Sequence, residues 1–287
     1  MLKILRILFK TILALVVVFA LLTVYSRYIE PHRLTVSDVF IENARMDHDS
    51  PGITIAVFAD THFSGYYTLN DFSKVIKAIN ERRPDMILFC GDLIDNYNTY
   101  EGDTEAISEA LSRLFAPMGK FAVYGNHDYG GGAHRAYGDI MENGGFTVLQ
   151  NEAVEFEEIK LTLIGLDDFL LGRGSAEFVG LAAGTDCFNI VLCHEPDVID
   201  GLLEYNVSIM AAAHTHGGQI NLGQKYITSL RHIFYPPYGR NYIKGLYRFD
   251  NDANTVLYVN PGLATTVLPL RFLNPPEATF ITITGAY

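Results

Sequence analysis

Short apolar runs recur along the 287-residue chain, and each ends in glycine or polar residues. The runs are four to seven residues long and rich in β-branched side chains, which is typical of strands rather than helices. Their near-continuous apolarity predicts strands buried on both faces of a sheet. Eight strands are expected, at residues 53–59, 86–90, 121–124, 161–166, 189–193, 208–212, 255–259 and 278–284.

Segments with apolar positions at helical spacing lie between several of these strands. Asn70 is expected to cap a helix that ends before Pro84, and Asp103 is expected to cap the next one. Weaker helical patterns cover residues 134–143 and 197–204. Strands that alternate with helices predict a layered α/β domain with its sheet in the middle.

The beginning of the chain has a different pattern. Residues 7–25 make a 19-residue apolar stretch interrupted only by Lys10, close to the roughly 20 residues that span a bilayer. Lys3 and Arg6 precede it, which is the flank expected on the cytoplasmic side. A cleaved signal peptide and a helix lodged at the lipid interface are the alternatives. We expect a single-pass anchor in the cell membrane, with the body outside the cytoplasm.

The anchor is assigned to residues 1–33. Residues 34–51 are expected to form a connector, whose alternating stretch LTVSDVFIE indicates an edge strand. Residues 52–287 contain no repeat, low-complexity tract or linker, so they are assigned to one domain.

Charge separates the same two parts. The whole chain carries −12, residues 1–33 carry +4, and the remainder therefore carries −16. A body this acidic, without a cluster of lysine and arginine, argues against a protein that coats the phosphate backbone of nucleic acid. The three cysteines indicate neither a disulfide scaffold nor a thiolate zinc site.

Five of the predicted strands are followed directly by aspartate, asparagine or histidine. These clusters are Asp60-Thr61-His62, Gly91-Asp92-Leu93-Ile94-Asp95, Gly125-Asn126-His127-Asp128, His194-Glu195-Pro196 and His214-Thr215-His216-Gly217-Gly218. Ligand sites in α/β sheets collect where strands end at their carboxyl edge, because the loops there converge on a crevice. Each cluster alone has an ordinary explanation as a turn, a cap or a structural histidine, but that explanation fails for all five together.

Seven of these side chains form a mixed set of nitrogen and oxygen ligands. They are Asp60, His62, Asp92, Asn126, His194, His214 and His216. The mixture suits Mn²⁺, Fe, Zn²⁺ or Co²⁺ rather than Ca²⁺, which prefers oxygen alone. Seven ligands are too many for one ion but suffice for two if a carboxylate bridges them. Two ions about 3.5–4 Å apart are the usual arrangement for phosphoester hydrolysis.

Together, these motifs resemble the calcineurin-like metallophosphoesterase superfamily over residues 52–285. The sequences HEPD, THGGQ and R…NPPE, beginning at His194, Thr215 and Arg271, are similar to its bacterial membrane-associated branch. That branch includes envelope phosphoesterases and UDP-2,3-diacylglucosamine pyrophosphatases. The resemblance implies a four-layer αββα sandwich, here preceded by one transmembrane helix.

Two positions depart from the family pattern. Ala213 replaces the usual glycine before the histidine pair, which a small residue still allows. Asn260-Pro261-Gly262 stands where many relatives have Ser-Arg-Gly, and the change removes a cation that could face the phosphate.

The resemblance also implies roles for the site residues. One ion would be held by Asp60, His62 and His216, the other by Asn126, His194 and His214, and Asp92 would bridge both. A hydroxide between the ions would attack phosphorus in line. His127 would protonate the leaving oxygen or stabilise charge there. Asp95, favoured over Asp128, would orient the His127 ring, unless both carboxylates only cap helices or turns.

Other polar residues have two interpretations each. Arg240 and Arg271 lie in segments that resemble substrate-side loops and are expected to bind phosphate, with a structural salt bridge as the alternative. Asp167 and Asp168 either line the mouth of the site or begin a loop. Residues 235–239 form an apolar lip beside the site or a packed loop.

The sequence therefore predicts a two-metal hydrolase of a phosphoester or pyrophosphate, with a membrane- or lipid-associated substrate. Its cofactors would be two divalent ions, Mn, Fe or Zn. No nucleic acid and no obligate protein partner are expected. The alternatives are a metal-binding membrane protein that has lost catalysis, and a nuclease of the same superfamily. His127 and Asp92 argue against the first, and the acidic body argues against the second.

Overall fold

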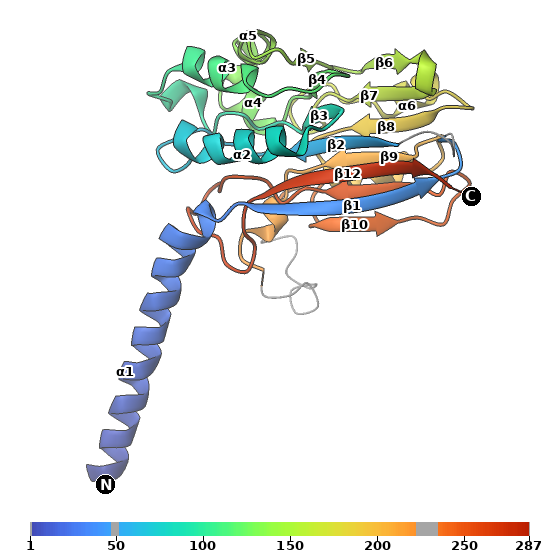
Figure 1. Cartoon of the computed structure of the whole chain (residues 1–287). Coiled ribbons are helices and arrows are strands. Elements are labelled where there is room, and N and C mark those ends of the chain that lie inside the picture. The colour runs from blue at the N-terminus through green and yellow to red at the C-terminus, as the bar shows by residue number, and fades with distance from the viewer. Residues whose placement is uncertain (1, 47–51, 222–234, 287) are drawn as a thin grey trace.

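A computed structural model of the protein describes residues 2–46, 52–221 and 235–286. A long N-terminal helix stands apart from a layered body (Figure 1). Residues 47–51, which end the predicted connector, lie outside the described residues.

The separate helix is α1 (Leu2–Val24), and none of its residues is buried. It continues through a π-helical turn, η1 (Tyr25–Ile29), and a 3₁₀ turn, η2 (Glu30–His32). At 1.5 Å per residue, the 23 residues of α1 extend about 34 Å, against about 30 Å for the hydrocarbon core of a bilayer. The helix is long and apolar enough to cross a membrane, so it fits the predicted anchor.

The first sheet has six strands in the order β1-β12-β2-β3-β4-β5. Adjacent strands in this sheet are parallel, except that β12 and β2 are antiparallel. The alternating stretch forms the edge strand β1, as predicted. The strands are β1 (Thr35–Asn43), β2 (Ile53–Phe58), β3 (Met86–Phe89), β4 (Lys120–Ala122), β5 (Thr147–Val148) and β12 (Glu277–Gly285).

The second sheet also has six strands, in the order β10-β11-β9-β8-β7-β6. Its four inner strands are parallel, and each edge strand is antiparallel to its neighbour. The strands are β6 (Glu152–Phe156), β7 (Leu161–Gly165), β8 (Phe188–Leu192), β9 (Ile209–Ala212), β10 (Gly245–Arg248) and β11 (Val256–Val259).

The two sheets pack face to face, with helices on both outer sides. Ile55 and Val57 of β2 belong to the core between the sheets, whereas Ala56 and Phe58 pack with the helices on the outer side. The outer layers consist of α2 (Leu69–Arg82), α3 (Thr104–Ser112) and α5 (Tyr137–Asn143) on the first sheet, and α6 (Ala176–Ala182) and the 3₁₀ helix η6 (Pro196–Gly201) on the second. This arrangement is the predicted four-layer αββα sandwich.

The eight predicted strands are present, but β5, β6 and β10 were missed because they are short or exposed edge strands. Asp103 caps α3 as predicted, since its carboxylate accepts a hydrogen bond from the Glu105 N–H at 2.9 Å. The predicted cap of α2 was wrong. The cap is Thr68, whose N–H donates to the Asp71 carboxylate at 3.2 Å, and Asn70 lies inside the helix. Only a 3₁₀ helix forms in the predicted helical segment 197–204.

The strand directions bring the predicted anchor helix and the candidate ligands to the same end of the body. β1 begins directly after the anchor and runs parallel to β12, which runs antiparallel to β2. The amino end of β1 and the carboxyl end of β2 therefore lie at the same end of the strands of the first sheet. In Figure 1, α1 leaves the body at that end.

Candidate metal centre

Loops at the carboxyl ends of β2, β3, β4, β8 and β9 bring the candidate ligands together. Among the residues that the structure describes, three overlapping groups have ligand atoms within 4.8 Å of one another. They are Asp60, His62 and His216; Asp92, His194 and His214; and His62, Asp92 and His127. The first two groups combine residues from both sheets.

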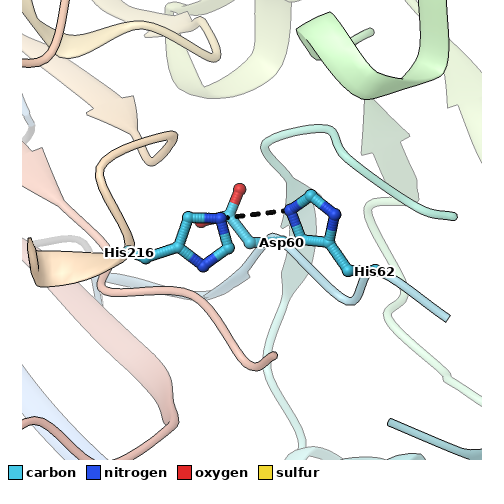
Figure 2. Close-up of side chains that lie close together, drawn as sticks. All are labelled: Asp60, His62 and His216. Carbon is cyan, nitrogen blue, oxygen red and sulfur yellow. Dashed lines mark hydrogen bonds between the residues drawn. The ribbon is translucent and has the colours of Figure 1, made fainter. Parts of the chain in front are cut away.

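The first group is shown in Figure 2, where the rings of His62 and His216 face each other near Asp60. Their Nε2 atoms are 3.1 Å apart. Asp60 is completely buried, and neither of its carboxylate oxygens has a hydrogen-bond partner among the described residues. Burial raises the pKa of Asp60 to about 6, although His194 lowers it. A buried carboxylate without donors is costly unless a cation compensates it.

The second group centres on His194. Its Nε2 lies 3.1 Å from Nδ1 of His214 and 3.2 Å from Oδ1 of Asn126. The structure therefore places Asn126 beside His194, and its assignment as a metal ligand stays a prediction.

Three of the histidines are oriented by a hydrogen bond from one ring nitrogen to a backbone carbonyl. His194 Nδ1 donates to the Cys90 carbonyl at 2.6 Å, and His214 Nε2 donates to the Pro237 carbonyl at 2.9 Å. His216 Nδ1 donates to the Ala264 carbonyl at 3.1 Å. Metal-binding histidines are commonly fixed in this way, because the bond to a carbonyl leaves the lone pair on the nitrogen that faces the site. Burial and the neighbouring His194 lower the pKa of His214 to about 3.

Asp92 lies between the two groups. Its Oδ2 is 3.4 Å from Nε2 of His62 and 3.3 Å from Nε2 of His194. Its Oδ1 accepts a hydrogen bond from the His127 N–H at 2.8 Å. Burial alone would raise the pKa of Asp92, but the two histidines lower it well below its ordinary value. These donors, with the unpartnered Asp60, fit divalent cations.

The backbone of the site is strained. Five of the seven candidate ligands have a left-handed backbone, with φ between 36° and 67°: Asp60, His62, Asp92, His214 and His216. Such conformations cost of order 1–3 kcal/mol each in non-glycine residues, and they cluster at functional sites. Close approach adds a further constraint at Gly125, where a Cβ atom would lie 2.3 Å from Oδ1 of Asp92.

Asp128 joins the loops of the site. Its carboxylate accepts hydrogen bonds from the N–H groups of Asp92, Leu93 and Gly125 at 2.8–2.9 Å. These backbone hydrogen bonds make Asp128 the turn cap that was the alternative interpretation. The signal for this role was available in the sequence, since an aspartate three residues after Gly125 is suited to cap the short helix α4 (Asn126–Gly130).

Asp95 has two separate contacts at the site. Its backbone carbonyl accepts a hydrogen bond from Nδ1 of His127 at 2.8 Å. Its carboxylate lies 3.2 Å from Nδ1 of His62 and 3.7 Å from Nδ1 of His127. The side chain is therefore closer to a candidate ligand than to the ring that it was expected to orient.

The structure gives Arg271 a structural role, but through backbone carbonyls rather than through the salt bridge that was the alternative interpretation. The side chain is completely buried, and its guanidinium donates to the backbone carbonyls of Pro261, Gly262, Ala264 and Asn274. Arg271 therefore supports the loop beside Asp60 and is not exposed to solvent, and substrate binding by Arg271 stays a prediction.

Arg240 lies in the loop that holds His214. Its Nε is buried and has no hydrogen-bond partner among the described residues. The preceding residue, Gly239, approaches the His214 ring, and the Pro237 carbonyl binds that ring. The predicted lip at residues 235–239 therefore lies beside the site, and substrate binding by Arg240 stays a prediction.

Asp167 and Asp168 hold a loop together. The Asp167 carboxylate accepts hydrogen bonds from the Tyr129 hydroxyl at 2.7 Å and from the Arg173 N–H at 2.9 Å. The Asp168 carboxylate accepts from the N–H groups of Leu171 and Gly172. The loop interpretation therefore describes both residues.

Two cavities meet at Asp95 and Asn96. The smaller, of about 310 Å³, is lined by Asn126, His127, Leu171 and Val267, among others. The larger, of about 590 Å³, lies between the loop after β2 and the beginnings of α2 and α3. Open space therefore extends on two sides of Asp95, and His127 faces the smaller of the two cavities.

The chain is similar in sequence to known phosphoesterases and to a pyrophosphatase. Residues 53–218 match the calcineurin-like phosphoesterase family. The uncharacterized metallophosphoesterase YkuE of Bacillus subtilis is 40% identical over 262 residues, covering 90% of this chain and 88% of that protein. Phosphodiesterase YaeI of Escherichia coli is 28% identical, with 90% and 91% covered. UDP-2,3-diacylglucosamine pyrophosphatase LpxG of Chlamydia muridarum is 22% identical, with 92% and 93% covered.

Proposed function

The chain belongs to the calcineurin-like phosphoesterase family, and we propose that it hydrolyses a phosphodiester or pyrophosphate bond at a centre of two divalent cations. The position of Asp92 carries this proposal. One of its oxygens lies 3.4 Å from His62 and 3.3 Å from His194, which belong to different ligand groups, as a bridging carboxylate requires.

The proposed ligands divide between the two ions. One ion would be held by Asp60, His62 and His216, and the other by Asn126, His194 and His214, with Asp92 shared. Bound Mn, Fe or Zn ions would neutralise charge on the phosphate and lower the pKa of coordinated water. The mixed nitrogen and oxygen donors support ions of this class.

His127 is proposed to protonate the leaving oxygen. Its Nδ1 is engaged by the Asp95 carbonyl at 2.8 Å, so Nε2 is the atom free to carry the transferred proton. The ring is partly exposed and lines the smaller cavity, where a substrate can reach it.

The two cavities favour a substrate that continues on both sides of the phosphorus atom. A small monoester would fill only one of them, whereas a diester or a pyrophosphate has groups to place in each. Arg240 is proposed to contact a phosphate oxygen, because its buried Nε lacks a partner among the described residues.

A membrane-associated substrate, such as a lipid-linked phosphate, is supported by two observations. The anchor helix enters the body at the end where the candidate ligands lie. One relative is named a UDP-2,3-diacylglucosamine pyrophosphatase, which identifies a lipid-linked substrate for that protein.

We further propose that residues 1–33 anchor the chain in the cell membrane, residues 34–51 connect, and residues 52–287 are the catalytic domain. β1 lies within the connector and already pairs with β12 of the domain. Lys3, Arg6 and Lys10 at the far end of α1 support a domain outside the cytoplasm.

The test is hydrolysis of bis-p-nitrophenyl phosphate by the full chain in detergent with Mn²⁺. Wild type should bind two ions and turn over, and Asp92→Asn should lose at least about 100-fold in turnover because the bridge is gone. Asp186→Asn, an exposed aspartate outside the site, is the matched control and should behave as wild type. Nearly full turnover of the Asp92 variant would overturn the proposal.

A further inference from the structure

One segment joins the candidate metal centre to the end of the anchor. We call residues 264–274 the rim segment. At its start, the Ala264 carbonyl accepts a hydrogen bond from His216, and Val267 lines the smaller cavity. Near its end, the Arg271 N–H donates to the Ser26 carbonyl at 2.9 Å, and the Asn274 N–H donates to the Glu30 carboxylate. The rim segment therefore lies against both the site and the last turns of the anchor.

The rim segment exposes large apolar side chains. Val267 is 94% exposed, Leu268 is 54% exposed and Leu273 is 61% exposed. Val267 and Leu273 also have a left-handed backbone, with φ of 58° and 56°. This conformation is rare for a β-branched residue such as valine. Grouped exposed apolar residues beside a functional cavity indicate a contact surface rather than chance exposure.

The anchor fixes the depth of this surface. Aromatic and basic residues concentrate at the membrane–water interface, where the rings sit at headgroup level. Tyr25, Arg27 and Tyr28 follow the apolar helix, and the Arg27 guanidinium lies 5.0 Å from the centre of the Tyr28 ring. The Tyr25 ring contacts Phe272 of the rim segment edge to face, with centroids 6.4 Å apart. The rim segment is therefore attached to the part of the anchor that belongs at the headgroups.

We propose that the rim segment inserts Val267, Leu268 and Leu273 into the lipid–water interface beside α1. The occupant of this surface is the bilayer, because the segment is bonded to a helix that fits a membrane span. The smaller cavity, which Val267 lines, then opens at the membrane surface. Given the proposed function, an acyl-bearing phosphoester reaches His127 with its chain along Val267 and Leu171 and does not leave the membrane.

Lipid contact can be measured directly on the full chain. Cys90 and Cys193 are buried, so a Cys187→Ser background with Leu268→Cys places one reactive thiol on the rim segment. An environment-sensitive fluorophore on that thiol is followed in phosphatidylcholine vesicles that contain nitroxide-labelled acyl chains. The matched control is Leu181→Cys in the same background, since Leu181 is 87% exposed and belongs to α6, a helix that lies far from α1 in Figure 1.

The label at position 268 should be quenched strongly by the nitroxide lipid, and the label at position 181 should not. Equal quenching at the two positions would overturn the proposal. The measurement needs no catalysis, so its outcome is independent of whether the proposed function holds. Thermal unfolding of both labelled chains checks that they keep the wild-type fold.

Kinetics give a second, separate readout. Leu268→Asn with Leu273→Asn should lower kcat/KM for a phospholipid held in vesicles by at least about tenfold, because two leucine contacts with the bilayer are lost. Activity on soluble bis-p-nitrophenyl phosphate should be unchanged, because neither side chain lines the cavities. Asparagine tolerates the left-handed backbone at position 273. Equal losses on both substrates would contradict a membrane role, and absence of hydrolysis of either by wild type would overturn the proposed function instead.

Discussion

The Asp95 carboxylate lies 3.2 Å from Nδ1 of His62, a closer approach than its 3.7 Å to Nδ1 of His127. Asp95 therefore contacts two histidine rings with different groups. Its carboxylate lies beside His62, and its backbone carbonyl accepts a hydrogen bond from His127. Burial lowers the pKa of His62, but the neighbouring carboxylates of Asp92 and Asp95 outweigh burial and raise this pKa to about 10. The same contact would orient His62 toward a bound cation.

This contact separates the effects of two substitutions. Asp95→Asn should weaken metal binding about tenfold, because an outer partner of a metal-binding histidine is lost. His127→Ala should keep the metal and lose about 10²–10⁴-fold in turnover, because only the proton donor is removed. Metal retention against a chelator, measured beside the turnover number, distinguishes the two. A variant of His127 that lost its metal would show that this ring is a ligand.

Gly262 is expected to be essential because it touches Asp60. A Cβ atom at this glycine would lie 2.4 Å from Oδ2 of Asp60, and its φ is +70°. Gly245 has a similar φ of +87°, but a Cβ there would meet nothing within 4 Å. Gly262→Ala and Gly245→Ala should therefore both lose about 1 kcal/mol of stability from backbone strain. Only the first should also lose metal and activity. Similar activities in the two variants would remove Asp60 from the proposed site.

Much of this architecture could be predicted from the sequence, for physical reasons that individual residues show. Ile55 and Val57 alternate with Ala56 and Phe58, and both pairs are buried, so the apolar run predicted β2. Asp60 and His62 follow it directly, and the parallel strand ends bring them to the other ligands. The local apolar pattern and the parallel direction of the strands were sufficient to predict β2 and the position of these two residues.

Other features depend on contacts that leave no local pattern. Arg271 binds backbone carbonyls from several positions, and no residue type marks such acceptors in a sequence. The Asp95 carboxylate approaches His62 only because two loops fold side by side. Thr68 and Asn70 are both good caps, and Asp71 decides between them by bonding the Thr68 N–H.

Glu30 is expected to stabilise the site although it belongs to the end of the anchor. It is 2% exposed and accepts a hydrogen bond from the Asn274 N–H, while the Asn274 side chain donates to the His216 carbonyl at 2.6 Å. Glu30→Ala leaves a buried N–H without an acceptor, at a cost of about 1–3 kcal/mol. The unfolding midpoint in detergent should fall by several degrees, and the metal should be removed by less chelator. The exposed Glu42→Ala on β1 should change neither.

Asp71 should make stability depend on pH at the junction of the anchor and α2. Burial raises the pKa of Asp71, but hydrogen bonds from His32 and from the Thr68 N–H lower it more, to below its ordinary 3.8. A lowered carboxyl pKa contributes stability above the unfolded-state value and loses it as the pH falls through the folded-state value. Asp71→Asn should therefore cost about 1 kcal/mol at pH 7, because Asp71 is the acceptor in the capping box that it forms with Thr68.

The gap between wild type and this variant should close as the pH falls below 3.8. Denaturant titrations of both chains at pH 7 and pH 3 measure it. A gap of the same size at both values would show that the charge of Asp71 contributes nothing.

The division of the proposed ligands between the sheets has a consequence for assembly. Asp60, His62, Asp92 and Asn126 follow strands of the first sheet, whereas the remaining ligands, His194, His214 and His216, follow strands of the second. Neither sheet alone supplies all the ligands of either proposed ion, because each ion has ligands from both sheets. Cation capture and the docking of the two sheets would thus be one cooperative event. A nascent chain would acquire its reactivity only when the second half of the fold closes on the first, so a partly folded chain would bind metal poorly and hydrolyse nothing.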